Sequence, residues 1–246
     1  MNTGETDLDR SAEAWLEEQG EHGDWARRHV LDRVMLHRSR RPGFRHALDV
    51  GCGEGRFCRL LKAADIAAVG IDPTERLLQE ARARDLEGDY RWGRAEDLPF
   101  DHGVFDLVVS YLSLIDIAGL EEAIAEMVRV CAPGGSLLIA NLASYNTAGQ
   151  PDGWTVRDGA PRFQIDHYSD HRPIRAQWRG MDIVNHHRPL AAYMSAFLHH
   201  GLRLTFFDEP SPQGYPPEDA EKAARYRRVP YFVVMEWQKP EGETDV

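Results

Sequence analysis

Short apolar runs and helix-spaced apolar residues alternate along the middle of the chain. The apolar runs predict strands near 46–50, 67–71, 89–92, 104–110 and 136–142. Apolar residues at helical spacing between them predict helices that end near Leu61, run from Thr74 to about Arg84, and run from Leu120 to Val130. This alternation predicts an α/β fold, with a parallel sheet that carries helices on both faces. A ligand is then expected at the carboxyl ends of the strands, beside the first strand.

Both flanks of this region add further elements. Residues 11–36 have apolar positions at roughly helical spacing and predict two helices. Residues 190–200 predict another helix, and residues 202–207 and 231–237 predict two alternating, aromatic-rich strands. Between 142 and 189 the periodicity breaks down, which predicts a long loop of the kind that is usually functional or mobile.

The first predicted strand ends in a turn that reads Gly51-Cys52-Gly53-Glu54-Gly55. Glycines at alternate positions let the backbone turn sharply and bring its N–H groups close to a small ligand. The dinucleotide fingerprint G-x-G-x-x-G does not fit this spacing, and the Gly-Lys-Ser/Thr signature of phosphate loops does not follow it. Asp49 before the turn and Glu54 within it favour a ligand with positive groups, such as an amino-acid-like amine.

This turn and four later segments resemble, in the same order, the motifs of class I S-adenosylmethionine-dependent methyltransferases. The matching segments are 48–55, 69–72, 93–100, 105–110 and 129–135. The segment 93–100 resembles the quinone C-methyltransferase-like group, and so do Arg-Pro-Leu-x-x-Tyr at 188–193 and Glu-Pro-x-Pro at 209–212. The resemblance covers nearly the whole chain. It implies a Rossmann-like, doubly wound, mostly parallel seven-stranded sheet with an antiparallel edge strand.

The same resemblance implies where S-adenosylmethionine binds. The methionine part is expected at the glycine turn, the ribose at the end of the second strand, and the adenine at the loop after the third. The expected cofactor residues are Asp49, Gly51, Cys52, Gly53, Asp72, Pro73, Ala95, Glu96 and Ser110. Because Arg94 stands where relatives usually have Asp or a small polar residue, Glu96, or Asp97 beside it, is expected to bind the adenine amino group. Many relatives have a histidine near the position of Asp116, so a relay through that histidine is not expected here.

Methyl transfer requires alignment of the acceptor and exclusion of water, and it requires a general base only where the acceptor must lose a proton. We predict a small-molecule acceptor, with O-methylation ahead of N- or C-methylation. Segment 143–189 is dense in aromatic and titratable residues and is expected to form the acceptor site. His187 or His167 is the candidate base, and His187 ranks first because Arg188 beside it would keep the imidazole neutral. No metal site is expected.

The N-terminal helices allow two interpretations. Trp15 and Trp25 either pack this segment on the core or belong to a lid, because N-terminal helices commonly cover the acceptor pocket in the resembled family. We expect one domain that spans residues 1–246. Its parts are an N-terminal helical lid (1–40), a cofactor-binding half (41–142), an acceptor-site insertion (143–189), and the last helix with the C-terminal strands (190–246).

Composition limits the possible partners. With 246 residues and 42% apolar content, the chain can bury one substantial core. A net charge of −11, from 29 basic and 40 acidic residues, argues against a nucleic-acid partner. Three cysteines without framework spacing predict a reducing, cytoplasmic environment. We expect no membrane association, since no stretch is long enough to span a bilayer and no signal pattern is present, and we expect a monomer or a homodimer.

Two other functions remain open at this stage. A member of the fold could bind S-adenosylmethionine without transferring its methyl group, since fold does not fix function. An NAD-dependent oxidoreductase is favoured only by an acidic residue about 20 residues after the glycines, a feature that both folds share. The glycine spacing argues against the oxidoreductase.

Overall fold

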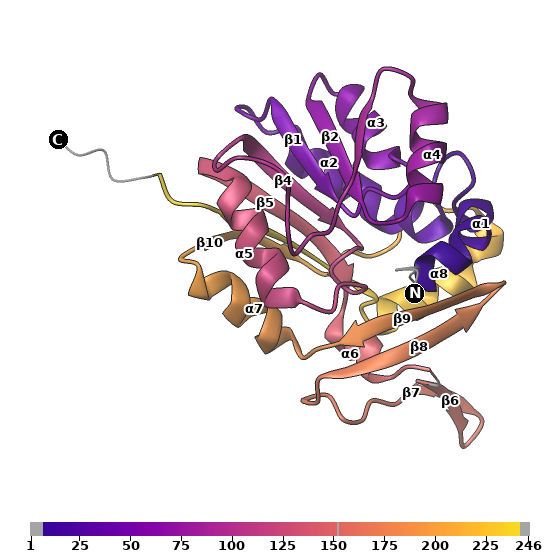
Figure 1. The fold of residues 1–246 in the computed structure, drawn as a ribbon. Coiled ribbons are helices and arrows are strands. Elements are labelled where there is room, and N and C mark those ends of the chain that lie inside the picture. The colour runs from indigo at the N-terminus through magenta and orange to yellow at the C-terminus, as the bar shows by residue number, and fades with distance from the viewer. Residues whose placement is uncertain (1–6, 152, 242–246) are drawn as a thin grey trace, which may run out of the picture.

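The computed structural model describes residues 7–151 and 153–241, which form a central sheet with helices on both sides (Figure 1). The strands of this sheet are β1 (His46–Val50), β2 (Ala67–Asp72), β3 (Asp89–Trp92), β4 (Phe105–Tyr111), β5 (Cys131–Leu142), β10 (Arg203–Asp208) and β11 (Phe232–Gln238). The helices are α1 (Asp7–Gln19), the π-helix η1 (Arg27–Leu31), α2 (Asp32–Ser39), α3 (Arg56–Lys62), α4 (Glu75–Arg84), α5 (Leu120–Val130), α6 (Ser144–Ala148), α7 (Leu190–His199), the 3₁₀ turn η2 (Pro217–Asp219) and α8 (Ala220–Arg228). None of these described helices has the length and apolar character needed to cross a bilayer.

The strands lie in the order β10-β11-β5-β4-β1-β2-β3. Strands β1 to β5 pair in parallel, and β11 runs antiparallel to both β5 and β10. This topology confirms the predicted mostly parallel, Rossmann-like sheet, and its antiparallel member lies next to the edge strand β10. The chain crosses from β3 back over the sheet to β4, so the strand order reverses between β1 and β4. The carboxyl ends of β1 and β4 therefore border a crevice where ligands bind folds of this type.

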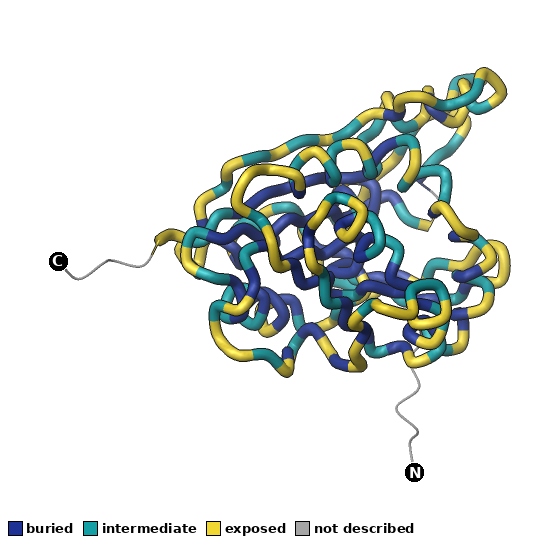
Figure 2. Tube along the Cα trace, turned by 90° about the horizontal axis from the view of Figure 1, so that it is seen from above, coloured by how far each residue is buried: buried dark blue, intermediate teal, exposed yellow. Residues whose placement is uncertain are grey.

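Each face of the sheet buries its own apolar cluster, because neighbouring side chains on a strand point to opposite faces. On β5, Leu137 and Ile139 pack in the cluster that includes side chains of α5 and α7. Leu138 and Ala140 pack in the other cluster, with side chains of η1, α2 and α3. Figure 2 shows the buried segments gathered at the centre of the molecule. Strands covered on both faces read as continuous apolar runs, which is why β4 and β5 could be recognised from the sequence.

The region 142–189, which we predicted to be a long irregular loop, contains α6 and two antiparallel hairpins, so that prediction is wrong. The hairpins consist of β6 (Trp154–Arg157) with β7 (Ala160–Phe163), and of β8 (Arg172–Trp178) with β9 (Met181–His187). Both hairpins lie on one side of the main sheet (Figure 1). The segment between β5 and α7 is therefore an ordered wall rather than a loose connection.

Both hairpins close through two-residue turns. The turn residues have positive φ angles, which are 52° at Asp158, 72° at Gly159, 44° at Arg179 and 83° at Gly180. Turns with two such residues match the right-handed twist of paired strands, and Asp-Gly is a characteristic sequence for them. Asp158-Gly159 was therefore a sequence signal for the first hairpin, whereas Arg179-Gly180 is a weaker one.

Helix α1 lies against the β8–β9 hairpin and α4 (Figure 1). The hydroxyl of Ser11 accepts the backbone N–H of Asp182 at 3.0 Å and lies 3.2 Å from the backbone oxygen of the same residue. At the hairpin turn, Arg179 forms an ion pair of 3.0 Å with Glu18. The N-terminal segment is thus attached to the insertion as well as to the sheet.

Truncation of Phe197 and of Phe207 should lower the stability of the protein by different amounts. Phe197 on α7 stacks on Trp237 of β11 with ring centroids 5.0 Å apart, and both side chains are fully buried. Phe197→Ala should leave a cavity and lower the free energy of unfolding by about 3–5 kcal/mol, measured by urea denaturation. Phe207→Ala is the matched control, since Phe207 on β10 is 41% exposed, and it should cost less than about 1.5 kcal/mol. Equal losses at the two positions would contradict this packing.

Candidate functional site

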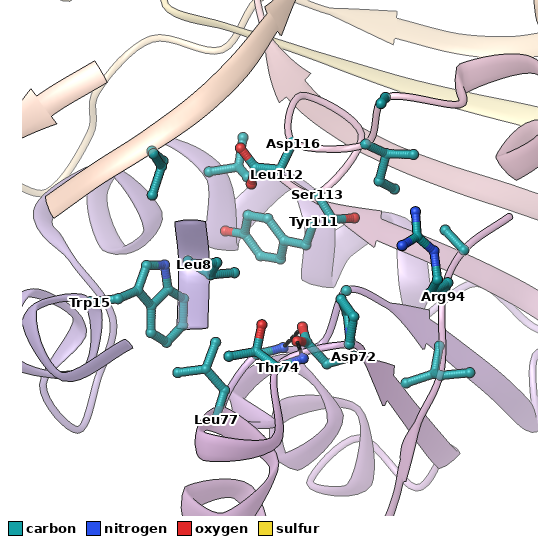
Figure 3. Close-up of a pocket in the computed structure, with 18 of the residues that line it drawn as sticks. Leu8, Trp15, Asp72, Thr74, Leu77, Arg94, Tyr111, Leu112, Ser113 and Asp116 are labelled. Atoms are coloured by element: carbon teal, nitrogen blue, oxygen red, sulfur yellow. Dashed lines mark hydrogen bonds between the residues drawn. The ribbon is translucent and has the colours of Figure 1, made fainter. Parts of the chain in front are cut away.

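A cavity of about 300 Å³ lies at the carboxyl ends of β1, β2 and β4 (Figure 3). The glycine turn, the segments that follow β2, β3 and β4, helix α1, η1 and strand β9 form its walls. Its lining residues are Leu8, Trp15, Arg27, Gly51, Gly53, Ile71, Asp72, Pro73, Thr74, Leu77, Gly93, Arg94, Ala95, Glu96, Tyr111, Leu112, Ser113, Asp116, Ile117, Ala118, Ile183, Val184 and His186. Of the expected cofactor residues, Gly51, Gly53, Asp72, Pro73, Ala95 and Glu96 line this cavity.

Gly51 and Gly53 bring the backbone of the turn into contact with neighbouring side chains. Their φ angles are 77° and 55°, in the region that favours glycine. A Cβ atom on Gly51 would lie 2.3 Å from the Cβ of Ser113, and one on Gly53 would lie 2.9 Å from the indole of Trp15. Any side chain at either position would displace a wall of the cavity. The glycine turn therefore has room for its backbone but not for a side chain at Gly51 or Gly53.

Asp72, the last residue of β2, is 3% exposed and fixes the glycine turn. Its carboxylate accepts the Gly53 N–H at 2.9 Å and the Thr74 N–H at 2.8 Å. Burial raises the pKa of this carboxyl, and the two N–H donors oppose the rise. A carboxylate has about four acceptor sites, so Asp72 keeps capacity for hydroxyl groups of a ligand in the cavity.

The two acidic residues that suggested a positively charged ligand do not line the cavity. Asp49 is buried beneath the turn, where one carboxylate oxygen has no hydrogen-bond partner and the other lies 3.6 Å from the Cys58 sulfur. Desolvation raises the pKa of Asp49 to about 7. Glu54 pairs with Arg59 at 2.5 Å and Arg84 at 3.1 Å. The interpretation of Glu54 as a partner for a ligand amine is therefore wrong, because its side chain is fully buried outside the cavity lining, with both arginines bound to its Oε2.

The segment after β3 supplies the wall expected to hold adenine. Ala95 is buried, and the half-buried Glu96 forms an ion pair of 3.2 Å with Arg94. Asp97 is exposed and outside the cavity lining, so Glu96 is the better placed of the two acidic residues. Pairing with Arg94 keeps the Glu96 carboxylate at the rim, where it remains able to accept a hydrogen bond.

Cys52 and Ser110, two of the expected cofactor residues, lie behind the lining. The Ser110 hydroxyl is 2.7 Å from the hydroxyl of Ser113, which donates to the backbone oxygen of Val50 at 2.6 Å. Cys52 is buried, and desolvation raises the pKa of its thiol. Both residues support the floor of the cavity from below.

Arg27 of η1 lines the cavity and was not expected from the sequence. Its guanidinium carbon lies 5.8 Å from the ring centre of Trp15 and 5.7 Å from that of Tyr111. The indole of Trp15 also lies against Gly53 of the glycine turn. Asp24 accepts a hydrogen bond from one nitrogen of the Arg27 guanidinium. The planar guanidinium can also bind the carboxylate of an amino-acid-like group.

Asp116, in the turn after β4, is the acidic group at the far end of the cavity (Figure 3). Its carboxylate accepts a hydrogen bond of 2.6 Å from Asn185. Asp116 is an exposed residue whose side chain borders the cavity. Desolvation by the surrounding protein raises the pKa of its carboxyl to about 7, and the hydrogen bond from Asn185 opposes the rise. His186 lines the same end, and burial lowers the pKa of its imidazole, as does Arg188. Both groups can exchange protons near neutral pH.

Neither histidine predicted as a base lies at the cavity. His187 is fully buried; its Nε2 is 3.0 Å from the backbone oxygen of Tyr168, and its Nδ1 is 2.6 Å from the Thr147 hydroxyl. A carbonyl only accepts, so Nε2 carries the proton and Nδ1 accepts from Thr147. His167 is exposed and pairs with Asp170 at 2.8 Å. These placements correct the sequence prediction, because both rings are engaged elsewhere in the insertion.

The position of Asp116 could have been inferred from the fold. Residues at the carboxyl ends of strands in open α/β sheets form the ligand crevice, and Asp116 lies in the turn that follows the end of β4 at Tyr111.

Over residues 7–151 and 153–241, no group of three or more His, Cys, Asp or Glu side chains is placed to hold a metal ion.

Comparisons with known proteins agree with this geometry. Residues 48–139 match the family described as "Methyltransferase domain". A malonyl-[acyl-carrier protein] O-methyltransferase from Erwinia billingiae is 30% identical over 182 residues, which cover 69% of this chain and 72% of that protein. A malonyl-[acyl-carrier protein] O-methyltransferase from Serratia marcescens is 32% identical over 132 residues, or 54% of this chain. The match spans 51%, about half, of the Serratia protein.

A solved structure extends the comparison to the fold. An S-adenosylmethionine-dependent methyltransferase from Mesorhizobium loti superposes with a TM-score of 0.72 at 24% sequence identity. The superposition covers 84% of this chain and 96% of the Mesorhizobium chain. The two chains therefore share their architecture over most of their length.

The geometry of Asp72 predicts its effect on binding of S-adenosylmethionine. Asp72→Asn should weaken the affinity by about 2 kcal/mol, roughly thirtyfold, because a charged acceptor for ligand hydroxyls is lost. Isothermal titration calorimetry measures this change. Asp97→Asn is the matched control in the neighbouring loop and should leave the affinity within about twofold. Unchanged affinity in the Asp72 variant would remove Asp72 from the ligand site.

Proposed function

The chain belongs to the class I S-adenosylmethionine-dependent methyltransferase family, and from this membership we propose that it transfers a methyl group from S-adenosylmethionine to an oxygen atom of a small molecule. The observation that carries the proposal is the continuity of the cavity. One continuous, partly open cavity joins the glycine turn and Asp72 to the group formed by Asp116 and His186. A cofactor and an acceptor bound in it can therefore lie next to each other.

The residues at the first end fit the cofactor. Gly51 and Gly53 leave space that a Cβ would fill, and Asp72 offers a buried carboxylate for ribose hydroxyls. Glu96 is placed for the adenine amino group, and Arg27 for the methionyl carboxylate. When bound, S-adenosylmethionine supplies a methyl group already activated by a sulfonium. The protein therefore has to hold, orient and dry the reacting groups.

The lining of the second end defines the class of acceptor. Apart from Asp116 and His186, this end presents the apolar side chains Leu112, Ile117 and Ile183. Such walls favour an apolar acceptor that carries one hydroxyl group. A carboxylate acceptor would meet like charge at Asp116 once that group is ionised. The O-methyltransferase names of the two relatives also favour transfer to oxygen.

A hydroxyl acceptor must lose a proton, and Asp116 is the group we assign to receive it. Its carboxyl has a pKa of about 7 and is held by Asn185, so the ionised form can accept a proton near neutral pH. His186 is the second candidate, because its lowered pKa keeps the imidazole neutral. This assignment takes the place of His187 and His167, which lie outside the cavity lining.

Helix α1 acts as a lid in this proposal. Leu8 and Trp15 line the cavity from above, whereas Trp25 packs on Tyr226 and Tyr215 at the other end of the N-terminal segment. The two tryptophans thus support the two earlier interpretations separately. Trp15 excludes water from the reacting groups, and Trp25 anchors the segment to the core.

We also propose a cellular location, a substrate class and an oligomeric state. We place the protein in the cytoplasm, because Cys52, Cys58 and Cys131 are buried free thiols. The net charge of −11 argues against a nucleic-acid substrate. A monomer or homodimer suffices, since the residues assigned here all come from one chain.

Two alternatives use the same fold. A member that binds S-adenosylmethionine without transferring its methyl group would have the same first end of the cavity. An NAD-dependent oxidoreductase would need the G-x-G-x-x-G turn, and this chain has a shorter glycine spacing. The test is a thermal-shift screen with S-adenosylmethionine, S-adenosylhomocysteine and NAD, in which the first two should raise the melting temperature and NAD should not.

Transfer itself is tested with methyl-labelled S-adenosylmethionine and a panel of apolar alcohols, phenols and carboxylic acids. We expect a hydroxyl compound to gain one labelled methyl group, detected by mass spectrometry. Carboxylic acids as the preferred acceptors would contradict the assigned acceptor class. Binding of the cofactor with no labelled product from any compound class would favour the non-methylating alternative.

The assignment of Asp116 as the proton acceptor predicts how turnover depends on pH. Because Asp116 must be ionised to accept a proton, turnover of the hydroxyl acceptor should rise with pH through about 7 and level off above it. Asp116→Asn should lower turnover by about a hundredfold or more with cofactor affinity intact. His186→Gln, compared in the same assay, shows which group is the base. Normal turnover and an unchanged pH profile in the Asp116 variant would exclude Asp116.

A further inference from the structure

The side chain of Arg188 is a buried cation without a carboxylate partner among the described residues. The residue follows β9 directly and is 6% exposed. Its guanidinium donates to the backbone oxygens of Leu114 at 3.3 Å, Ile117 at 2.6 Å and Ala118 at 2.9 Å. The ring of Tyr193 lies 5.9 Å from the guanidinium carbon. The carbonyl dipoles of one turn thus stabilise a permanent positive charge.

Two neighbours of Arg188 bind the same turn. The backbone N–H of His186 donates to the backbone oxygen of Ile115 at 2.7 Å. The side chain of Asn185, which is 5% exposed, donates to the carboxylate of Asp116 at 2.6 Å. Residues 185–188 therefore contact every residue of the turn from 114 to 118 through a polar group.

The chemistry of this contact requires arginine. Burying a cation without a counter-ion is costly, so stability alone does not account for Arg188. Its planar fork presents five donors in fixed directions, whereas a lysine ammonium is a compact point charge on a flexible stem. Removal of the fork would leave the carbonyl groups of Leu114, Ile117 and Ala118 unpaired inside the protein. The turn would then have to rearrange to reach other donors.

We propose that Arg188 is a positioning residue that, together with Asn185, holds the turn 114–118 in the form in which Asp116 and Ile117 shape the acceptor end of the cavity. The inference rests on the proposed function, because it gives Asp116 its role. It also gives a purpose to the Arg-Pro-Leu-x-x-Tyr segment, which the cofactor site leaves unused. The insertion between β5 and α7 thereby sets a turn that belongs to the cofactor-binding half.

The charged groups that face Asp116 come from several elements. Arg27 of η1 lowers the pKa of its carboxyl, and Asp72 of β2 raises it. His186 of β9 lines the same end of the cavity. Displacement of the turn changes the exposure of Asp116 to water and its distance to all three groups, so the titration of Asp116 reports the position of the turn.

The test compares Arg188→Gln and Arg188→Lys with a control, Arg129→Gln. Arg129 on α5 also donates to two backbone oxygens, of Phe100 at 2.7 Å and Leu98 at 2.8 Å, but in a turn outside the cavity lining. The readouts are hydrogen exchange of the amides 113–118, the carboxyl ¹³C titration of Asp116 assigned with Asp116→Asn, and affinity for S-adenosylhomocysteine. None of these readouts requires a known acceptor.

Both Arg188 variants should speed exchange across 113–118 by about tenfold or more, since local opening of the turn becomes easier. The titration midpoint of Asp116 should move down toward that of a fully hydrated aspartate, because the protein groups that desolvate its carboxyl move away, and affinity for S-adenosylhomocysteine should change by less than about threefold. Arg129→Gln should change none of the three. A folded Arg188→Lys or Arg188→Gln protein with native exchange and native titration would overturn the proposal.

Asn185→Leu provides an independent variant if Arg188→Gln does not fold. It removes the hydrogen bond to Asp116 and leaves the three bonds of Arg188 in place, so the titration of Asp116 should move, and exchange across 113–118 should speed up by less than in the Arg188 variants. A native titration in this variant would also count against the proposal. Failure of the wild-type protein to bind S-adenosylhomocysteine would instead remove the proposed function, and the exchange data would still report on the turn.

Discussion

The organisation of the site depends on one close contact, in which the backbone at Gly51 meets Ser113. A Cβ atom on Gly51 would lie 2.3 Å from the Cβ of Ser113. Because Gly51 has no side chain, the Ser113 hydroxyl reaches the backbone oxygen of Val50 at 2.6 Å. The glycine turn after β1 and the turn after β4 are therefore packed as one unit. The position of one turn fixes the position of the other, and with it the distance between the two ends of the cavity.

The same edge of the sheet gathers three carboxyl groups with raised pKa values, the buried Asp49 and Asp72 and the exposed Asp116. Desolvation is the main cause of each rise, and the charge of Asp72 raises the pKa values of the other two. Arg27 acts in the opposite direction on Asp49 and Asp116. An edge with this balance favours a ligand that brings positive charge, such as a sulfonium, and such a ligand would lower the pKa of all three groups.

The sequence was sufficient for the parts of the structure that depend on local patterns. Short apolar runs located the five parallel strands of the sheet, and alternating apolar residues located the last two strands. The glycine turn with Asp72 located the first end of the cavity. The two hairpins of the insertion were missed because short, half-exposed strands have weak alternation, although Asp158-Gly159 is a turn signal.

Side chains that meet only in three dimensions were beyond reach. Arg27 lies in the N-terminal segment and Asp116 in the cofactor-binding half, and no spacing rule shows that both line one cavity. His187 was predicted as a base from its neighbour Arg188, whereas its environment is set by Thr147 and Tyr168, which are distant in sequence. Titration and access depend on tertiary contacts, so a histidine-rich segment indicates polarity without indicating which ring faces the ligand.

The walls of the cavity differ in the free energy needed to open them, because α1 is attached less firmly than the strands of the sheet. The sheet side is held by strand pairing and two apolar clusters. Helix α1 is held by a smaller apolar cluster, in which Ala12 and Leu16 pack on Leu77 of α4. Its polar contacts with the hairpin, of Ser11 with Asp182 and of Glu18 with Arg179, can be replaced by water or weakened by salt. Detachment of α1 is thus a local opening that leaves the sheet intact, so access to the cavity from this side depends on the local stability of α1 and not on the global stability of the fold.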